Sequence, residues 1–525
     1  MTILKIIEYL QKSLPWKDFL YELSKQGFQI SNSLHTRNKN SLNSGIIIIV
    51  DNLISSGTIR DTSLLSLTPY VISRPKTEEQ LRKIVILSRK FKVPITFASG
   101  KTGLSGGFSN FGILVDLENM HSNAKPIIID MHNNRIYAEQ SVLISDLIKI
   151  VKYKSKGKFM FPIQPASALK LPVRLGGLIA SNASGITSGK LGAAEEWIIN
   201  MRIMLPNGDI CEVKKEDPLF NKIVGGNGFY GIILSANLKL YQPEVNLNKA
   251  LIFGDDLISA FNGLQKVLEA KIFPLVSEFV TSPIKLPGEF GKLIPSKEHS
   301  TNFKVNWVVL MKGKSKLINN FIEIMANECK SYWIKLTEEE YQKYMQERSS
   351  FAILVQTSED DINHIAFPGF EDILSQPKYL PNIINTINSI LIKNGFHEVI
   401  FGYGHINFRK GKGLLLHMRL PVPINYFYRE NTEKLVQICE TVYEVIRTLQ
   451  ENFKIKYKAE HSSGPFEVWL NPQFRRSLER DIQQGIAFYN PHLMIYNQAK
   501  HEFNTSSSQN MDKELFVSSM ILYLR

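Results

Sequence analysis

The stretch at residues 97–120, FASGKTGLSGGFSNFGILVDLENM, decides the fold of the N-terminal half of the chain. It places five glycines in its first sixteen residues and then continues into the apolar residues of a strand. Glycine is favoured where the backbone takes a positive φ or where another group approaches it closely. A strand followed by a glycine-rich turn lets backbone N–H groups converge on an anion, usually a phosphate. Because a strand and not a helix follows these glycines, the stretch does not match a dinucleotide-binding GxGxxG motif.

Two further glycine clusters follow the first. GGLIASNASG, at residues 176–185, has almost no large side chains, and GGNGFYGIILSANLKL, at residues 225–240, runs from glycines into a strand. Between them, WIINMRIMLPNGDICEV at residues 197–213 predicts a hairpin with Asn207 and Gly208 at its turn. Three such clusters in one region predict a site in which a large planar ligand lies against the backbone.

The regions on either side of the clusters predict an alternation of helices and strands. Pro75 is expected to open a helix, with Thr77 and Gln80 at capping-box spacing, and VPITFAS at residues 93–99 reads as the next strand. From about residue 246, longer helical patterns at 255–274, 315–333 and 433–453 are separated by strands such as 302–313 and 413–422. Helices mixed with antiparallel strands predict an α+β domain.

Composition narrows the class of protein. A chain of 525 residues with 44% hydrophobic and 10% aromatic residues is expected to form two or three domains. The cysteines, Cys211, Cys329 and Cys439, are widely spaced, which predicts neither a disulfide framework nor a thiolate metal site. The N-terminal twenty residues read as an amphipathic helix and not as a secretory signal. A cytoplasmic protein is therefore expected, peripheral at the inner face of a membrane at most.

The formal charge of +13 and the pI of about 9.3 raise the question of a nucleic-acid partner. The basic residues are scattered, without a basic run interleaved with aromatics of the kind that a strand-binding groove shows, so nucleic acid is not expected. A basic surface also suits an anionic lipid or an acidic partner.

Six motifs, taken in order, resemble a known family: RPKTEEQL, KTGLSGG, FPIQPAS, GGLIASNASG, LPNGDI and GGNGFYGIILSANLKL. They are similar to those of FAD-linked oxidases of the vanillyl-alcohol oxidase and para-cresol methylhydroxylase (PCMH) type. The similarity is to the branch of glycolate oxidase subunits, D-lactate dehydrogenases and D-2-hydroxyglutarate dehydrogenases. The resemblance implies an α+β fold: a PCMH-type, two-subdomain FAD-binding module at 61–245 and an α+β cap domain with an antiparallel sheet at 246–470. An N-terminal helical region at 1–60 precedes them, and a C-terminal return to the FAD domain with a tail occupies 471–525.

The resemblance also implies cofactor contacts. The loop residues expected to wrap the FAD pyrophosphate are Ser99, Gly100, Lys101, Thr102, Gly103, Leu104, Ser105 and Gly106. The remaining expected contacts are Pro165, Gly176, Gly177, Asn182, Ala183, Ser184, Gly185, Gly192, Gly228, Ile233 and Asn497. The family usually has glycine at the position of Lys101. No histidine occurs in SGKTGLSGG or beside NASG, so FAD is expected to be held without a covalent bond.

For the cap domain, the resemblance implies a substrate site. His405, His417 and Glu460 correspond to ligands of Zn or another divalent metal, His461 to the general base, and Arg348 to an arginine that anchors the substrate. The chain departs from the family here, because HINFRKGKGLLLH stands in place of HxGDGNxH and Ile362 stands at a lysine position.

The expected activity is FAD-dependent oxidation of a 2-hydroxy acid such as D-lactate, glycolate or 2-hydroxyglutarate, or of a related alcohol. Electrons would pass to a quinone, a protein or oxygen. Two alternatives stay open: an alkyl-glycerone-phosphate-synthase-like flavoenzyme, with the basic loop at 409–412 holding a phosphate, and a flavin-binding or flavin-less interaction protein whose catalytic site has decayed. A homodimer is also left open.

Overall fold

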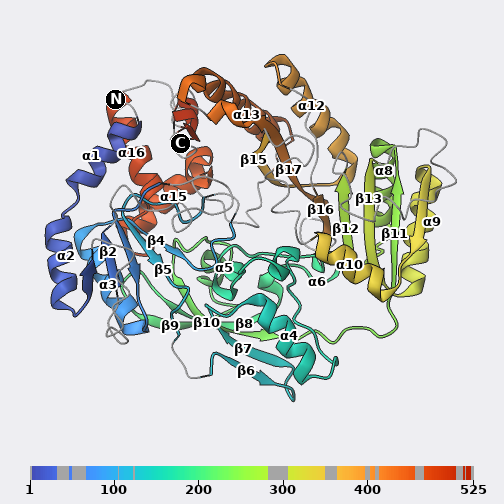
Figure 1. Cartoon of the computed structure of the whole chain (residues 1–525), viewed down its shortest axis with the longest axis horizontal. Helices are drawn as coiled ribbons and strands as arrows, with labels where there is room; N and C mark the ends of the chain where they lie inside the picture. Colours follow the sequence, from blue (N-terminus) through green and yellow to red (C-terminus); the bar gives the residue numbers. More distant parts are fainter. Residues whose placement is uncertain are drawn as a thin grey trace.

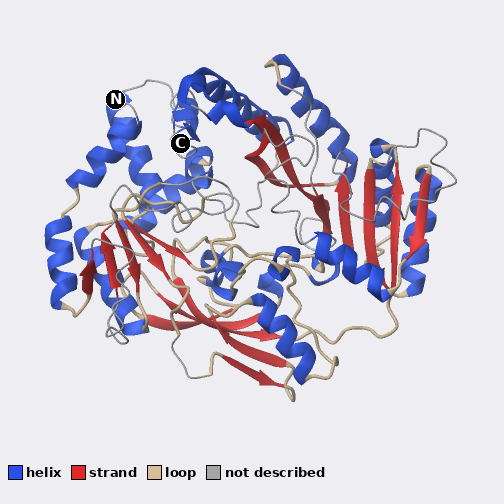
Figure 2. Ribbon diagram, viewed as in Figure 1, coloured by secondary structure: helices blue, strands red, loops and turns tan. Residues whose placement is uncertain are grey.

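The structure is a computed structural model, and three β-sheets organise it (Figure 1). It describes residues 3–31, 46–49, 67–103, 106–121, 125–281, 306–348, 364–396, 403–407, 413–427, 429–453, 455, 466–503, 512–514, 516–518 and 520–521, and the statements below concern these residues. Two sheets lie in the N-terminal half and the third lies in the cap, which matches the α+β architecture expected from the sequence (Figure 2).

The first sheet has the strand order β1-β2-β3-β5-β4. Its strands are β1 (Gln29–Ser31), β2 (Ile46–Ile49), β3 (Val71–Arg74), β4 (Ile95–Ala98) and β5 (Ile113–Asp116). Helix α3 (Glu78–Phe91) connects β3 to β4, and β3, β5 and β4 are parallel to one another. The glycine-rich stretch therefore begins at the carboxyl end of β4 and returns into the sheet as β5, between β3 and β4.

Two helix boundaries differ from the sequence prediction. Helix α3 begins at Glu78 and not at Pro75, because the Thr77 side chain caps it by accepting a hydrogen bond from the Gln80 N–H at 3.2 Å. The N-terminal amphipathic segment forms two helices, α1 (Ile3–Ser13) and α2 (Trp16–Lys25). The break falls at Pro15, which has no N–H to continue α1.

The second sheet is antiparallel, with the strand order β6-β7-β10-β8-β9. Its strands are β6 (Ile127–Asp130), β7 (Arg135–Glu139), β8 (Ile198–Met204), β9 (Ile210–Lys214) and β10 (Ile232–Lys239). Strands β8 and β9 form the predicted hairpin, and Gly208 takes a φ of +85° at its turn. The helices in this region are α4 (Ile144–Lys154), α5 (Leu175–Ala180), α6 (Ser188–Leu191) and α7 (Phe220–Ile223).

The cap sheet is antiparallel, with the strand order β14-β11-β13-β12-β16-β17-β15. Its strands are β11 (Asn248–Gly254), β12 (Val276–Thr281), β13 (Trp307–Gly313), β14 (Ser331–Lys335), β15 (His364–Ser375), β16 (Tyr403–Asn407) and β17 (Gly413–Pro423). Its helices are α8 (Leu257–Glu269), α9 (Ser315–Glu328), α10 (Glu338–Arg348), α12 (Leu380–Lys393) and α13 (Thr432–Phe453).

The two faces of the cap sheet pack against different layers. Ile252 and Val309 face the core shared with α8 and α9, whereas Leu251 and Leu310 pack with α10. Leu191, at the end of α6, belongs to the same apolar cluster as Leu251. The cap sheet therefore presents one face to the N-terminal half of the chain, with α10 between them (Figure 1).

The C-terminal helices return to the N-terminal half. They are α14 (Phe466–Leu470), α15 (Pro472–Gln483) and α16 (Pro491–Phe503), and α16 packs on α1. The Ile95 N–H donates to the Tyr489 carbonyl at 3.2 Å, and the Phe488 N–H donates to the Phe229 carbonyl at 2.9 Å. This segment therefore fastens to β4, the strand that leads into the glycine-rich stretch. No helix in the described ranges is both long and apolar enough to cross a membrane.

Candidate functional site

A pocket opens where the carboxyl end of β4 meets the second glycine cluster. One wall is the turn after β4, and the opposite wall is the segment from Pro165 to Ser184, which includes α5. The predicted cofactor residues that line it are Ser99, Gly100, Lys101, Thr102, Gly103, Pro165, Gly177, Ala183 and Ser184. The fold thus brings the first two glycine clusters together across one space.

Two glycines explain the shape of this pocket. A Cβ at Gly100 would lie 2.1 Å from the Pro172 carbonyl oxygen, so only glycine lets the turn approach the opposite wall. A Cβ at Gly177 would meet no atom within 4 Å, because this side of α5 faces the open space of the pocket. The Ser99 hydroxyl is buried at the pocket and has no hydrogen-bond partner among the described residues. An open glycine face beside a buried hydroxyl fits a ligand that lies against the backbone, as FAD does in the expected site.

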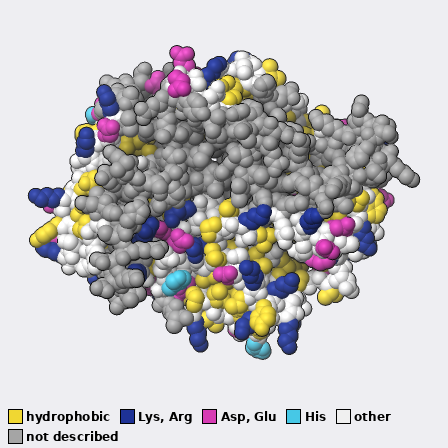
Figure 3. Space-filling view, in the orientation of Figure 1, with side chains coloured by type: hydrophobic (Ala, Val, Ile, Leu, Met, Phe, Trp, Pro, Cys, Tyr) yellow, Lys and Arg dark blue, Asp and Glu magenta, His cyan; other side chains and the backbone are white. Residues whose placement is uncertain are grey.

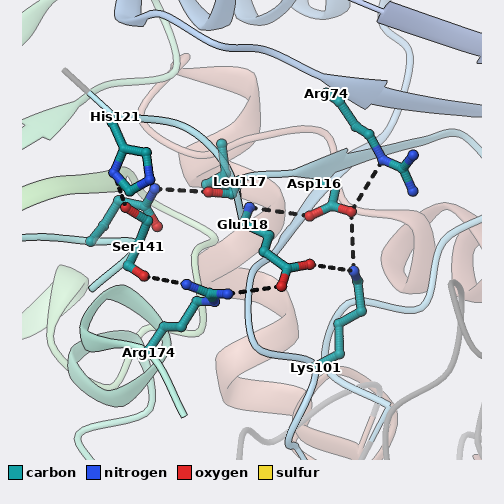
Figure 4. Close-up of polar contacts among 9 residues, drawn as sticks. Arg74, Lys101, Asp116, Leu117, Glu118, His121, Ser141 and Arg174 are labelled. Carbon is teal, nitrogen blue, oxygen red and sulfur yellow. Dashed lines mark hydrogen bonds and ion pairs between the residues drawn. The ribbon is translucent and has the colours of Figure 1, made fainter. Parts of the chain in front are cut away.

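Charged side chains border the pocket on one side (Figure 4). The Lys101 ammonium lies 3.0 Å from Asp116 Oδ2 and 3.8 Å from Glu118 Oε2. Asp116 also pairs with Arg74 at 3.4 Å, and Glu118 pairs with Arg174 at 2.8 Å. This network joins the turn after β4 to Arg174, the residue that precedes α5. Three cations share two carboxylates, which leaves one positive charge to balance a phosphate.

Lys101 fits the turn in spite of the departure from glycine. Its φ is +54°, in the left-handed region that glycine adopts most readily. Its ammonium folds onto the buried carboxylate of Asp116, so the side chain follows the edge of the pocket. The lysine therefore occupies a glycine-like conformation that an ion pair holds in place.

Sequence reasoning missed several residues of the pocket. Arg174 donates to Glu118 and to the Ser141 carbonyl, and it lines the wall next to Gly177. Asn227, with a φ of +51°, lines the pocket beside the third glycine cluster. An arginine two positions before GG and an asparagine inside GGNG were the available signals. Gly107, Leu178, Ala180 and Ser181, from the first two glycine clusters, also line the pocket as expected. The other lining residues that were not predicted are Phe97, Ala98, Phe108, Ser167 and Val173.

Other predicted cofactor residues lie outside this lining and have structural contacts. A Cβ at Gly185 would lie 2.4 Å from the backbone of Gln164, and one at Gly176 would lie 2.9 Å from the Gln140 side chain. Gly106 and Gly228 take positive φ angles of +68° and +76°. Asn182 accepts a hydrogen bond from the Glu195 N–H, and Asn497 donates one to Glu479. Gly192 follows α6, and Ile233 lies in β10. Leu104 and Ser105 lie outside the described residues.

A buried acid–histidine pair marks the cap sheet. Glu278 in β12 is opposite His405 in β16, and the Glu278 carboxylate contacts His405 Nδ1. Both side chains are buried. Burial, together with the negative charge of Glu278, raises the pKa of Tyr341 in α10 above its ordinary value. Helix α6, which follows the second glycine cluster, packs on both β12 and β16. The pair therefore lies in the layer where the cap meets the cofactor half.

The other predicted cap residues are His417, Arg348, Glu460 and His461. His417 lies in β17, where its backbone is opposite that of Tyr403 in β16. Arg348 ends α10, while Glu460 and His461 lie outside the described residues. In the described part of the chain, no group of three or more His, Cys, Asp or Glu side chains gathers to hold a metal. The predicted metal site therefore has no support there.

Comparison with known proteins shows what this chain is similar to in sequence. A family model described as an FAD binding domain matches residues 69–214. The chain is 25% identical over 353 residues to glycolate oxidase subunit GlcD of Bacillus subtilis (strain 168), covering 64% of this chain and 71% of that protein. It is also 25% identical to a D-lactate dehydrogenase of Anaerostipes hadrus, over 44% of this chain and 49% of that protein. A D-2-hydroxyglutarate dehydrogenase of Stutzerimonas stutzeri (strain A1501) is 25% identical, over 40% and 46%. The matches thus span about half the length of the two dehydrogenases.

Solved structures show the same fold at low identity. A 4-ethylphenol oxidase from Gulosibacter chungangensis superposes with a TM-score of 0.60 at 14% identity, over 82% of this chain and 92% of that chain. An alkyldihydroxyacetonephosphate synthase superposes with a TM-score of 0.59 at 15% identity, over 81% and 78%. The matched domain holds both walls of the glycine-lined pocket, and the fold extends through the cap. Residues 69–214 therefore match an FAD binding domain, and the chain is similar in sequence to FAD-linked hydroxy-acid oxidases and dehydrogenases and in fold to 4-ethylphenol oxidase.

Proposed function

We propose that this chain oxidises a small 2-hydroxy acid of the D-lactate, glycolate or 2-hydroxyglutarate kind, with FAD held noncovalently in the glycine-lined pocket. The observation that carries the proposal is the convergence of Ser99, Gly100 and Gly177 on one space inside the matched FAD domain. The pocket-lining residues in the described part of the chain include no histidine or cysteine, which agrees with noncovalent binding. When bound, FAD supplies the two-electron acceptor that oxidation of a CH–OH group requires.

On the cofactor side, the chain supplies a turn of small residues and a net positive border. Gly100 and Gly103 bring the backbone to the pocket surface, and backbone N–H groups are suitable donors to phosphate oxygens. The ammonium of Lys101 and the guanidinium of Arg174 offset phosphate charge while Asp116 and Glu118 hold both side chains in place. In this proposal, these residues bind FAD and set its orientation.

On the substrate side, a hydroxy acid needs a base for its hydroxyl proton and a cation for its carboxylate. We assign these roles to His461 and Arg348, as the resemblance implies. The Glu278 carboxylate contacts Nδ1 of His405 in the same layer of the cap. A carboxylate in contact with a histidine fixes the orientation of its ring. We assign no step to a metal, and the electron acceptor beyond FAD is left unassigned among quinone, protein and oxygen.

Anaerobic titration of the purified protein with glycolate, D-lactate and D-2-hydroxyglutarate tests the proposal. Loss of the oxidised-flavin absorption with one of them is the expected result. In the variant His461→Ala, the rate of this loss should fall by roughly 10² to 10⁴ with FAD content unchanged, as for removal of a general base.

The same titration separates the alternatives. A protein purified without flavin that binds no added FAD would favour the interaction protein with a decayed site. A flavoprotein that stays oxidised with every hydroxy acid, yet exchanges the acyl group of an acyl-glycerone phosphate for an alcohol, would favour the synthase-like activity.

A further inference from the structure

Helix α4 and the turn after it carry a concentrated positive charge that the proposed chemistry does not use. Five lysines fall within ten residues, and no Asp or Glu occurs from residue 147 to residue 158. All five are exposed: Lys149, Lys152, Lys154, Lys156 and Lys158. Asp146, one turn earlier, is the nearest carboxylate along the chain.

An aromatic ring lies within this charge. Lys149, Lys152 and Tyr153 follow the i, i+3, i+4 spacing of one helix face, and Lys156 lies in the turn directly after α4, with a φ of +51°. The Tyr153 side chain is 79% exposed, although aromatic side chains are usually at least partly buried. We call Lys149, Lys152, Tyr153 and Lys156 the α4 face.

These lysines have no carboxylate partner within the ranges that the structure describes. Some other lysines of the chain do have such a partner, as Lys393 has in Glu444 at 3.1 Å and Lys190 has in Glu244 at 3.0 Å. No ion pair of the α4 face occurs among the described residues. Its charge is therefore available to an anionic partner.

We propose that the α4 face docks the protein on a membrane surface that contains anionic phospholipid. Unpaired lysines near an anionic bilayer are each attracted to it, and a tyrosine among them suits the headgroup layer, where an apolar ring with a polar tip is stable. Helix α4 lies on the outer edge of the molecule (Figure 1), and Lys and Arg side chains appear along that edge (Figure 3). An outward-facing helix can meet a flat surface. A single nucleic-acid strand would instead need a groove with several aromatic rings.

The docked orientation has a consequence that rests on the proposed function. Leu143, which precedes α4, forms a β-bridge with Arg174, a residue of the cofactor pocket. An 11-residue helix is about 16 Å long at 1.5 Å per residue, so the lysine-rich end of α4 lies about that far from the bridge. Docking through the α4 face would hold the pocket close to an acceptor dissolved in the membrane.

Vesicle flotation with the full-length protein tests the docking. The probes are phosphatidylcholine vesicles with and without phosphatidylglycerol, and a mixed-sequence single-stranded DNA. The test variant combines Lys149→Glu, Lys152→Glu and Lys156→Glu. The matched control combines Lys12→Glu, Lys17→Glu and Lys25→Glu, exposed lysines of α1 and α2 on the other side of the molecule, with the same change in net charge.

The wild-type protein and the control variant should float with the anionic vesicles at low salt and not with the neutral ones. The α4 variant should bind at least tenfold more weakly while retaining its FAD, and Tyr153→Ala should lose several-fold. Equal loss in the control variant would reduce the effect to net charge and overturn the proposal. So would an α4 variant that still floats, or DNA binding that is tighter than vesicle binding and depends on the same lysines. Hydroxy-acid oxidation is not part of this readout, so the proposed function can fail independently.

Discussion

The Glu278 carboxylate contacts Nδ1 of His405 across two neighbouring strands of the cap sheet, with both side chains buried. A buried carboxylate is stable only with a partner, and the pair faces the layer between the cap and α6. His405 is therefore one member of a buried acid–histidine pair.

The first prediction concerns the stability of this pair. Glu278→Ala removes the carboxylate that contacts His405 Nδ1 in a buried layer and should lower the free energy of unfolding by about 1–3 kcal/mol. Glu278→Gln keeps an acceptor oxygen and should cost less. Glu328→Ala, which removes a surface ion pair with Lys266, is the control and should cost at most about 1 kcal/mol. Urea unfolding measures all three, and a Glu278→Ala cost no larger than the control would contradict the role of the pair.

The second prediction concerns the open side of α5. Since a Cβ at Gly177 has no neighbour within 4 Å, Gly177→Asp should fold normally and lose FAD, because its carboxylate projects into a phosphate-binding space. Gly103→Asp and Gly106→Asp should also lose FAD. Gly177→Ala is the size control and should keep most of it. Circular dichroism reports the fold and absorbance reports the flavin, and full flavin content in Gly177→Asp would remove the cofactor from this wall.

The third prediction concerns Lys101. At ordinary helix and strand positions alanine is more stable than glycine, but a φ of +54° should reverse the order. Lys101→Gly should be more stable than Lys101→Ala by about 1 kcal/mol, while both lose the ion pair with Asp116. Thermal unfolding of the two variants isolates the backbone contribution. Greater stability of the alanine variant would mean that the turn does not hold this conformation in solution.

The fourth prediction concerns pH. Burial lowers the pKa of His492 in α16 from 6.5 to about 3, so this side chain is neutral in the folded protein. Below pH 6.5 His492 of the unfolded chain becomes protonated, whereas His492 of the folded chain stays neutral until the pH falls to about 3. The free energy of unfolding therefore decreases as the pH falls from 6.5 to about 3. His492 should contribute a slope of up to about 1.4 kcal/mol per pH unit there and none above it.

Unfolding of His492→Gln between pH 4 and pH 7 checks this slope. The variant should lose less stability on acidification than the wild-type protein, because one proton fewer separates its folded and unfolded states. The exposed His501 in the same helix supplies the control, and His501→Gln should follow the wild-type curve. Parallel curves for the wild-type protein and His492→Gln would show that this histidine is not held neutral.

Local features of the fold were predictable because they depend on short spacings. The Thr77 cap and the turn at Asn207 and Gly208 depend on residues within a few positions of one another, and both are present. The glycine clusters also predicted the pocket, since Gly100 and Gly177 face the same space. Pro15 divides the N-terminal segment into two helices, a break that the helical spacing of the apolar residues alone did not reveal.

Long-range pairs were not predictable. Glu278 and His405 are 127 residues apart and meet only because β12 pairs with β16, a register that depends on the whole cap sheet. Arg174, on one wall of the pocket, and Glu118, which follows β5, come together in the same way. Periodicity indicates which face of an element is buried, but it does not indicate which strands become neighbours. The assignments to Arg348, Glu460 and His461 stay predictions from resemblance.

FAD should lie in the glycine-lined pocket without a covalent bond to the chain. Acid precipitation of the purified full-length protein, followed by flavin analysis of pellet and supernatant, measures this. The expected result is FAD in an amount stoichiometric with the chain, all of it released into the supernatant, and none in Gly177→Asp prepared in parallel. A flavin that stays with the pellet, or a protein that neither contains nor takes up FAD, would contradict the claim.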